Sequence, residues 1–235
     1  MRQIVLDTET TGLDAVRGHR VIEIGCVELC ERRPSGRVFH RYLNPQRQVD
    51  RGAAEVHGLS DEFLADKPLF AQVADEFIAF IDGAELIIHN AAFDVGFLDA
   101  ELSRLGAEAG RITDRCRVLD TLKLARERYP GQRNSLDALC KRLGVDHSGR
   151  DLHGALLDAN LLVEVYLALT AGQGEMSFSA PVSAAATRTE VLDGARLGAL
   201  RVLRAGIDEL AVHEARLDAI AKVAKKSALW RELQA

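Results

Sequence analysis

The stretch Ile4-Val5-Leu6-Asp7-Thr8-Glu9-Thr10-Thr11-Gly12 decides the fold and the chemistry expected of this chain. Its first three residues are apolar and two are β-branched, which predicts a buried strand. Side chains alternate faces along a strand, so Asp7 and Glu9 would point the same way. Two such carboxylates repel each other unless a cation lies between them, and Mg²⁺ or Mn²⁺ prefers oxygen ligands. The alternative is a solvated strand end that runs into a turn at Gly12.

Length and composition are those of an ordinary globular protein. The chain has 235 residues, of which 47% are hydrophobic and 28% charged, enough for one sizeable domain and an appendage. Met1-Arg2-Gln3 leads directly into the first strand, and no apolar run approaches the length of a membrane span. We therefore expect no signal peptide, no membrane segment and a cytoplasmic location.

The four cysteines do not have the spacing of a zinc site. They stand at Cys26, Cys30, Cys116 and Cys140, and no second Cys/His pair accompanies the first two. We expect buried, reduced thiols.

Net charge is negative and unevenly spread. The whole chain carries −5, and residues 1–186 carry 21 Lys/Arg against 28 Asp/Glu, or −7. Non-specific affinity for nucleic acid comes mainly from Lys/Arg contacts to phosphate. If the substrate is a nucleic acid, metal ions must offset the carboxylates or a partner must deliver the substrate.

The hydrophobic pattern predicts a mixed sheet with helices on both faces. Three early strands, the last two joined through Pro34-Ser35-Gly36, form an antiparallel meander. A polar stretch with Val56-His57-Gly58-Leu59 precedes a helix start at Ser60. Strands and helices then alternate. The predicted strands cover 4–9, 21–29, 37–43, 86–90 and 116–120, and the main helices cover 70–81, 93–105, 121–128, 135–143 and 156–169.

The last quarter of the chain has a different composition. Residues 171–189 are rich in Gly, Ala, Ser and Thr, which is typical of a linker. Residues 190–235 regain helical periodicity, with Leu210, Leu217, Ile220 and Ala224 on one stripe. Such a short segment cannot bury its own apolar face, so we expect it to contact a partner.

Two further acidic residues lie at the starts of predicted helices. Asp94 follows a buried strand in His89-Asn90-Ala91-Ala92-Phe93-Asp94, where the helix dipole alone would favour a carboxylate. Asp158 lies among leucines in His153-Gly154-Ala155-Leu156-Leu157-Asp158-Ala159, and a buried carboxylate needs a partner. His153 precedes it and is the natural proton acceptor, although a lone histidine is more often a surface or capping residue.

Four carboxylates on three elements and one histidine meet the needs of phosphodiester hydrolysis with two metal ions. Taken in order, the motifs at 7–12, 89–94 and 153–159 resemble the three exonuclease motifs of the DEDD superfamily, histidine variant. The resemblance implies an RNase H-like fold, with a mixed five-stranded sheet flanked by helices, and 3′→5′ removal of nucleotides.

The same resemblance implies roles for individual residues. Asp7, Glu9 and Asp158 would hold the first of two divalent metal ions (Mg²⁺ or Mn²⁺), and Asp7 would bridge to the second. Asp94 would support the second ion through water, and His153 would be the general base. The residues expected to hold the terminal nucleotide of a DNA 3′ end are Thr10, Thr11, Gly12 and, beside the primer end, His57.

The C-terminal part is similar to that of the proofreading subunits of bacterial replicative DNA polymerases. The similarity implies that a tail at 190–235 docks on the polymerase catalytic subunit through Leu210, Leu217, Leu229 and Trp230. Gln173, Met176 and Phe178 resemble the Q-x-x-[LM]-x-F peptides that bind bacterial sliding clamps. The implied organisation is an exonuclease domain at 1–172, a flexible linker at 173–189 and the polymerase-binding helical tail.

Two other functions remain open from the sequence. An exonuclease of the same superfamily could trim RNA 3′ ends, since nothing near the motifs reveals how a 2′-OH is treated. The chain could also be a non-catalytic scaffold between clamp and polymerase, although a scaffold has no need of the acidic residues.

Overall fold

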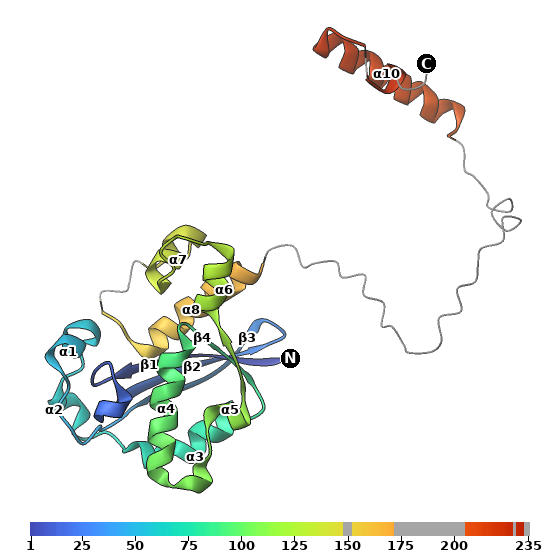
Figure 1. The fold of residues 1–235 in the computed structure, drawn as a ribbon. Coiled ribbons are helices and arrows are strands. Elements are labelled where there is room, and N and C mark those ends of the chain that lie inside the picture. Colours follow the sequence, from blue (N-terminus) through green and yellow to red (C-terminus); the bar gives the residue numbers. More distant parts are fainter. Residues whose placement is uncertain (148–151, 172–204, 228, 233–235) are drawn as a thin grey trace, which may run out of the picture. The chain divides into compact units, whose positions relative to one another are not determined.

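The computed structural model of the chain describes residues 1–147, 152–171, 205–227 and 229–232 (Figure 1). It separates into two units, Met1–Ser177 and Phe178–Ala235, which are described one at a time. The linker residues predicted to bind a sliding clamp, Gln173, Met176 and Phe178, lie outside the described residues.

A mixed five-stranded sheet forms the centre of the first unit, as predicted. Its order is β3-β2-β1-β4-β5, with β1, β2 and β3 antiparallel and with β4 and β5 parallel to β1. The first three strands form a meander because their connections are short, and β4 and β5 are each reached through helices. The strands are β1 (Arg2–Thr10), β2 (Val21–Cys30), β3 (Arg33–Tyr42), β4 (Glu85–Ile88) and β5 (Arg117–Asp120).

Helices cover both faces of this sheet. One core includes α3 and α4, and the other includes α7 and α8. The helices of the unit are α1 (Arg51–His57), α2 (Asp61–Leu64), α3 (Phe70–Ile81), α4 (Ala91–Leu105), α5 (Ile112–Arg115), α6 (Thr121–Arg128), α7 (Leu136–Leu143) and α8 (Ala155–Thr170). Two 3₁₀ turns, η1 (Ala15–Arg17) and η2 (Ala107–Ala109), complete it.

The central strand β1 shows how the sequence determines the two cores. Ile4 and Leu6 belong to the core with α3 and α4, whereas Val5 belongs to the core with α7 and α8. All three are fully buried. Because the alternation continues along the strand, Asp7 and Glu9 share the face of Val5, which is the face that α8 covers.

The predicted connection through Pro34-Ser35-Gly36 is wrong, because these residues are part of β3. The turn is made instead by Glu31 and Arg32, which both have positive φ (49° and 62°), the backbone of a two-residue primed hairpin turn. β3 is an edge strand, and a proline that lacks an N–H group is tolerated at an edge.

Two smaller expectations are also corrected. The stretch that contains Val56 and His57 is not a polar loop but the end of helix α1, which stops where Gly58 takes a left-handed conformation with φ 72°. Of the four free cysteines, Cys30 is exposed and only the other three are buried.

The second unit contains α10 (Ile207–Ala224) and the short α11 (Leu229–Glu232). Only Leu217 is buried among the apolar residues described there, and Leu210 and Trp230 are more than half exposed. Arg231 binds Asp218 at 2.9 Å and also contacts Glu214, which ties α11 to α10. Among the described helices of both units, none is long and apolar enough to cross a membrane.

Candidate active site

The strand β1 carries the first pair of carboxylates into the site. Asp7 and Glu9 are both half-buried, and their partners across the sheet on β2 are Gly25 and Glu23. Residues directly opposite in an antiparallel pair share a face, so all of these positions lie under the start of α8.

Gly25 allows α8 to approach the sheet closely enough to complete the site. A Cβ atom added at Gly25 would lie 2.3 Å from the backbone carbonyl carbon of Ala155 and the amide nitrogen of Leu156. The first turn of α8 therefore rests directly on the backbone of β2. The sequence prediction treated Gly25 only as a strand residue, although a glycine inside a strand is a known signal of close backbone approach.

This contact brings Asp158 and His153 to Glu9. Ligand atoms of these three residues all lie within 4.8 Å of one another, the spacing of a group that can hold a metal ion. His153 Nδ1 lies 3.2 Å from Asp158 Oδ2, and the backbone N–H of His153 donates to the carbonyl of Val56 at 3.1 Å. Asp158 is buried and His153 is half-buried, so the group is open to solvent through the histidine.

Asp94 reaches the same region from the opposite face of β1. It lies in the first turn of α4, is 3% exposed, and accepts a hydrogen bond of 2.7 Å from the Thr8 hydroxyl. Burial raises the pKa of Asp94 to about 7, although the Thr8 hydroxyl opposes the shift and the nearby charge of Asp120 adds to it. Thr8, which the sequence prediction did not single out, thus holds the carboxylate of Asp94 against β1.

The structure groups only part of the predicted ligand set. Among the described residues, the one group with metal-ligand spacing contains Glu9, His153 and Asp158, and it does not include Asp7 or Asp94. Carboxylate oxygens with one imidazole suit Mg²⁺ or Mn²⁺, and imidazole also suits other transition metals. The residues present therefore fit a divalent cation.

A cavity of about 580 Å³ opens beside Glu9. Thr10, Gly12 and His57 all line it, together with Phe93 from α4. Thr11 does not line this cavity: its side chain is fully buried and accepts a hydrogen bond from the backbone of Arg20 at 3.0 Å. Three of the four residues predicted to hold a terminal nucleotide therefore surround one hollow.

His57 is the most unusual of these lining residues. Its Nδ1 accepts a hydrogen bond from the backbone of Leu59 at 3.0 Å, which leaves the proton of the neutral ring on Nε2. Nε2 is buried and has no partner with good hydrogen-bond geometry among the described residues. Burial lowers the pKa of His57, although the backbone of Thr10 nearby opposes that shift, so the ring is a neutral donor at the cavity wall.

The fold and this site define a nuclease, and residues 4–166 match the RNase_T exonuclease family. Solved structures of exonuclease X with 5′ overhanging duplex DNA and of exonuclease I share the fold. Their TM-scores are 0.54 and 0.61, their identities 24% and 18%, and they cover 71% of this chain and 90% and 40% of their own.

The chain belongs to the DNA polymerase III subunit epsilon family. It is 52% identical to that subunit from Escherichia coli K12, over 98% of this chain and 97% of the relative. It is 48% identical to the subunit from Pasteurella multocida, over 98% and 94%. The predicted class, a proofreading 3′→5′ exonuclease, is confirmed.

Proposed function

We propose that this chain removes nucleotides from DNA 3′ ends by metal-assisted hydrolysis while bound to a replicative DNA polymerase. The observation that carries the proposal is the group of Glu9, His153 and Asp158, together with the cavity of about 580 Å³ that Glu9 also lines. The names of the relatives support DNA, rather than RNA, as the substrate.

We infer that two divalent ions, Mg²⁺ or Mn²⁺, act at this site. Such ions, when bound, stabilise the attacking and the leaving oxygens of the displacement. Asp7, Glu9 and Asp158 would hold one ion, and Asp7 and Asp94 would support the other. Asp94 favours a site with a second cation, because a buried carboxylate with a raised pKa becomes charged most easily when a cation is near.

His153 is the proposed general base. When its Nδ1–H donates to Asp158, the basic lone pair of the ring lies on Nε2. That atom would take the proton from the attacking water, and the Asp158 carboxylate would stabilise the imidazolium that results. The half-buried position of His153 allows water to reach the ring.

The cavity beside Glu9 is the proposed pocket for the terminal nucleotide. Thr10 and Gly12 line it, and the Thr10 hydroxyl donates to the Gly12 carbonyl at 2.7 Å. Phe93 offers an aromatic face for stacking, and His57 lines the same cavity. A frayed or single-stranded end would enter more readily than a paired one, since only an unpaired base can turn into a pocket.

The C-terminal residues are proposed to attach the exonuclease to its partners. The exposed apolar residues of α10 and α11, which include Leu210 and Trp230, support docking on the polymerase catalytic subunit. The peptide with Met176 and Phe178 would bind a sliding clamp. These partners also favour a cytoplasmic location.

Degradation of 3′-labelled DNA tests the proposal. We expect hydrolysis with Mg²⁺, faster release from a mismatched than from a matched end, and no hydrolysis with chelator. RNA of the same sequence serves as the comparison substrate. Activity that resists chelator, or activity on RNA alone, would contradict the proposed function.

A further inference from the structure

The α6–α7 region concentrates positive charge in an otherwise acidic chain. Residues 121–142 hold six Lys/Arg and two Asp/Glu, a net charge of +4, whereas the whole chain carries −5. The region comprises α6, the loop after it and most of α7. A charge of this sign and density attracts polyanions.

Two of these cations help to hold the fold together, because Arg128 donates to the carbonyl of Leu169 and Arg142 donates to Asn134 at 3.0 Å. Three others do not. Lys123, Arg126 and Arg133 are exposed, and none of them forms an ion pair with a described residue. Arg20 shows the contrasting case, since it binds the buried Glu101 through two hydrogen bonds of 2.6 and 2.7 Å. Lys123, Arg126 and Arg133 therefore remain available for an external anion.

Arg126 also lines a hollow of about 450 Å³ at the ends of β4 and α6. The ring of His89 forms one wall, held by Thr121 through a hydrogen bond of 3.0 Å. Burial lowers the pKa of His89 and the charge of Arg126 adds to that shift, whereas the backbone of Asn134 and the charge of Asp120 oppose it. The polar residues that line the hollow are His89, Asn90, Arg126, Gln132, Asn134 and Ser135.

The hollow and the cavity beside Glu9 both border the start of α4, since Asn90 lines the hollow and Phe93 lines the cavity. Asn90 precedes α4, the helix that carries Asp94, and its backbone N–H donates to Asp120 at 3.3 Å. Asp120 in turn caps the start of α6 by accepting from the backbone of Leu122 at 2.9 Å. His89 and Asn90 follow β4 directly and Leu122 follows β5, so the hollow lies beyond the carboxyl ends of these two strands.

We propose that Arg126, flanked by Lys123 and Arg133, binds phosphates of the DNA strand upstream of the nucleotide that is removed. A guanidinium matches two phosphate oxygens, and the amide of Gln132 adds a neutral donor beside it. The inference rests on the proposed function, because a strand whose last phosphodiester reaches the carboxylates must continue past them. Local positive charge at α6–α7 would explain how a chain of net charge −5 binds DNA.

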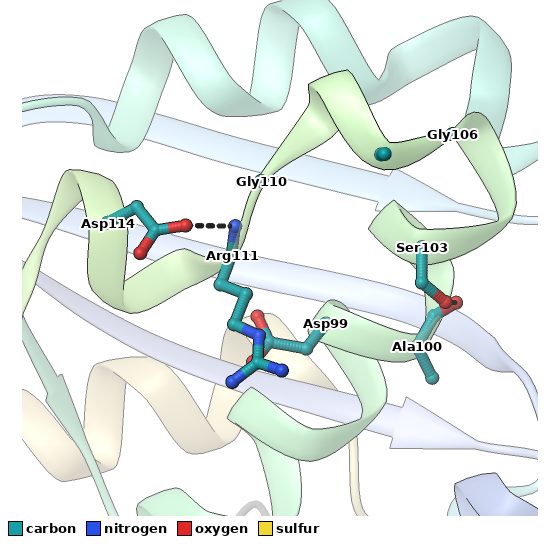
Figure 2. A pocket seen from close by; sticks show the side chains of 8 residues that line it. Asp99, Ala100, Ser103, Gly106, Gly110, Arg111 and Asp114 are labelled. Atoms are coloured by element: carbon teal, nitrogen blue, oxygen red, sulfur yellow. Dashed lines mark hydrogen bonds between the residues drawn. The ribbon is translucent and has the colours of Figure 1, made fainter.

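The test compares two triple variants of the full-length chain that change net charge equally. The first variant is Lys123→Gln, Arg126→Gln and Arg133→Gln. The control is Arg33→Gln, Arg104→Gln and Arg111→Gln, three exposed residues. Arg111 lines a separate hollow near the C-terminal end of α4, together with Asp99 and Asp114 (Figure 2). There Asp114 accepts a hydrogen bond from the backbone N–H of Arg111, and Asp99 accepts one from that of Ile112.

Affinity for a single-stranded oligonucleotide is measured as a function of salt. We expect the α6–α7 variant to bind more weakly at low salt. The slope of log affinity against log salt should fall in magnitude by about 2, because each of the three lost phosphate contacts contributes about 0.7 to it. The control variant should match the wild type. Both variants should hydrolyse a nitrophenyl ester of thymidine 5′-monophosphate normally, because that substrate has no upstream phosphate.

A slope equal to that of the wild type, or an equal loss in the control variant, would overturn the proposal. So would a loss of activity on the nitrophenyl ester, which would mean that the substitutions disturb the catalytic residues. If the wild-type chain hydrolyses neither the oligonucleotide nor the nitrophenyl ester, the proposed function itself fails. That result differs from failure of the phosphate-binding proposal alone, in which the wild type still hydrolyses both.

Discussion

Gly25→Ala tests whether backbone contact between β2 and α8 assembles the active site. The added Cβ would lie 2.3 Å from backbone atoms of Ala155 and Leu156, and ordinary contact begins at 3.4 Å. The backbones of β2 and α8 must therefore separate by about 1 Å, because the atoms in the way are backbone atoms and no side chain can rotate away. His153 and Asp158 flank this point, so both would be displaced from Glu9.

A displacement of about 1 Å in a catalytic group costs roughly 10²-fold in rate. Overpacking against a helix in the core should also lower the free energy of unfolding by about 1–3 kcal/mol. We expect single-turnover hydrolysis of saturating single-stranded DNA to slow by this factor at temperatures well below the melting transition. Thermal unfolding of the same sample gives the loss of stability.

Gly96→Ala is the matched control. Gly96 is an exposed residue within α4, and no atom lies within 4 Å of the position of an added Cβ. Alanine is favoured over glycine in a helix by roughly 0.5–1 kcal/mol, so this variant should be slightly more stable and fully active. If Gly25→Ala were as active and as stable as the control, the close approach would not be what positions Asp158.

Four other variants test the remaining assignments. Asp7→Ala should abolish hydrolysis yet leave the melting temperature in chelator unchanged or higher, because a like-charge repulsion is relieved; a marked loss of stability there would make Asp7 structural. His153→Ala should slow hydrolysis by roughly 10²–10⁴-fold, the range of general-base catalysis, and a nearly normal rate with an unchanged pH profile would remove it from the mechanism. In chelator, the free energy of unfolding should fall by up to about 4 kcal/mol as pH rises from about 4 to about 7. The reason is that Asp94 keeps its proton up to about pH 7 in the folded protein but loses it near pH 4 in the unfolded chain. Asp94→Asn should flatten that dependence in urea titrations, and an unchanged slope would refute the assignment. Met176→Ala with Phe178→Ala should abolish binding to the sliding clamp while hydrolysis of free DNA stays normal, and equal clamp affinities in titrations would make the resemblance a coincidence of composition.

Local sequence patterns were enough to predict the fold class and the motif residues. Alternation along β1 separates Leu6 from Asp7 and Glu9, because strand geometry alone determines which face a side chain occupies. Apolar residues at helical spacing predicted α3 and α4, because helix geometry places such residues on one face. Local turn signals were less reliable, because the hairpin between β2 and β3 uses Glu31 and Arg32 instead of the nearby glycine.

The assembly of the site depended on contacts between residues far apart in the chain. Thr8 binds Asp94 across 86 positions, and Gly25 meets the start of α8 only after both have packed on the sheet. No periodicity in the sequence encodes such pairs, since they arise where separate elements pack together. The sequence by itself indicated which residues are proposed to carry the chemistry and on which elements they lie. The tertiary structure alone decided that Glu9, His153 and Asp158 come within reach of one ion, because their separation depends on how closely two backbones can approach.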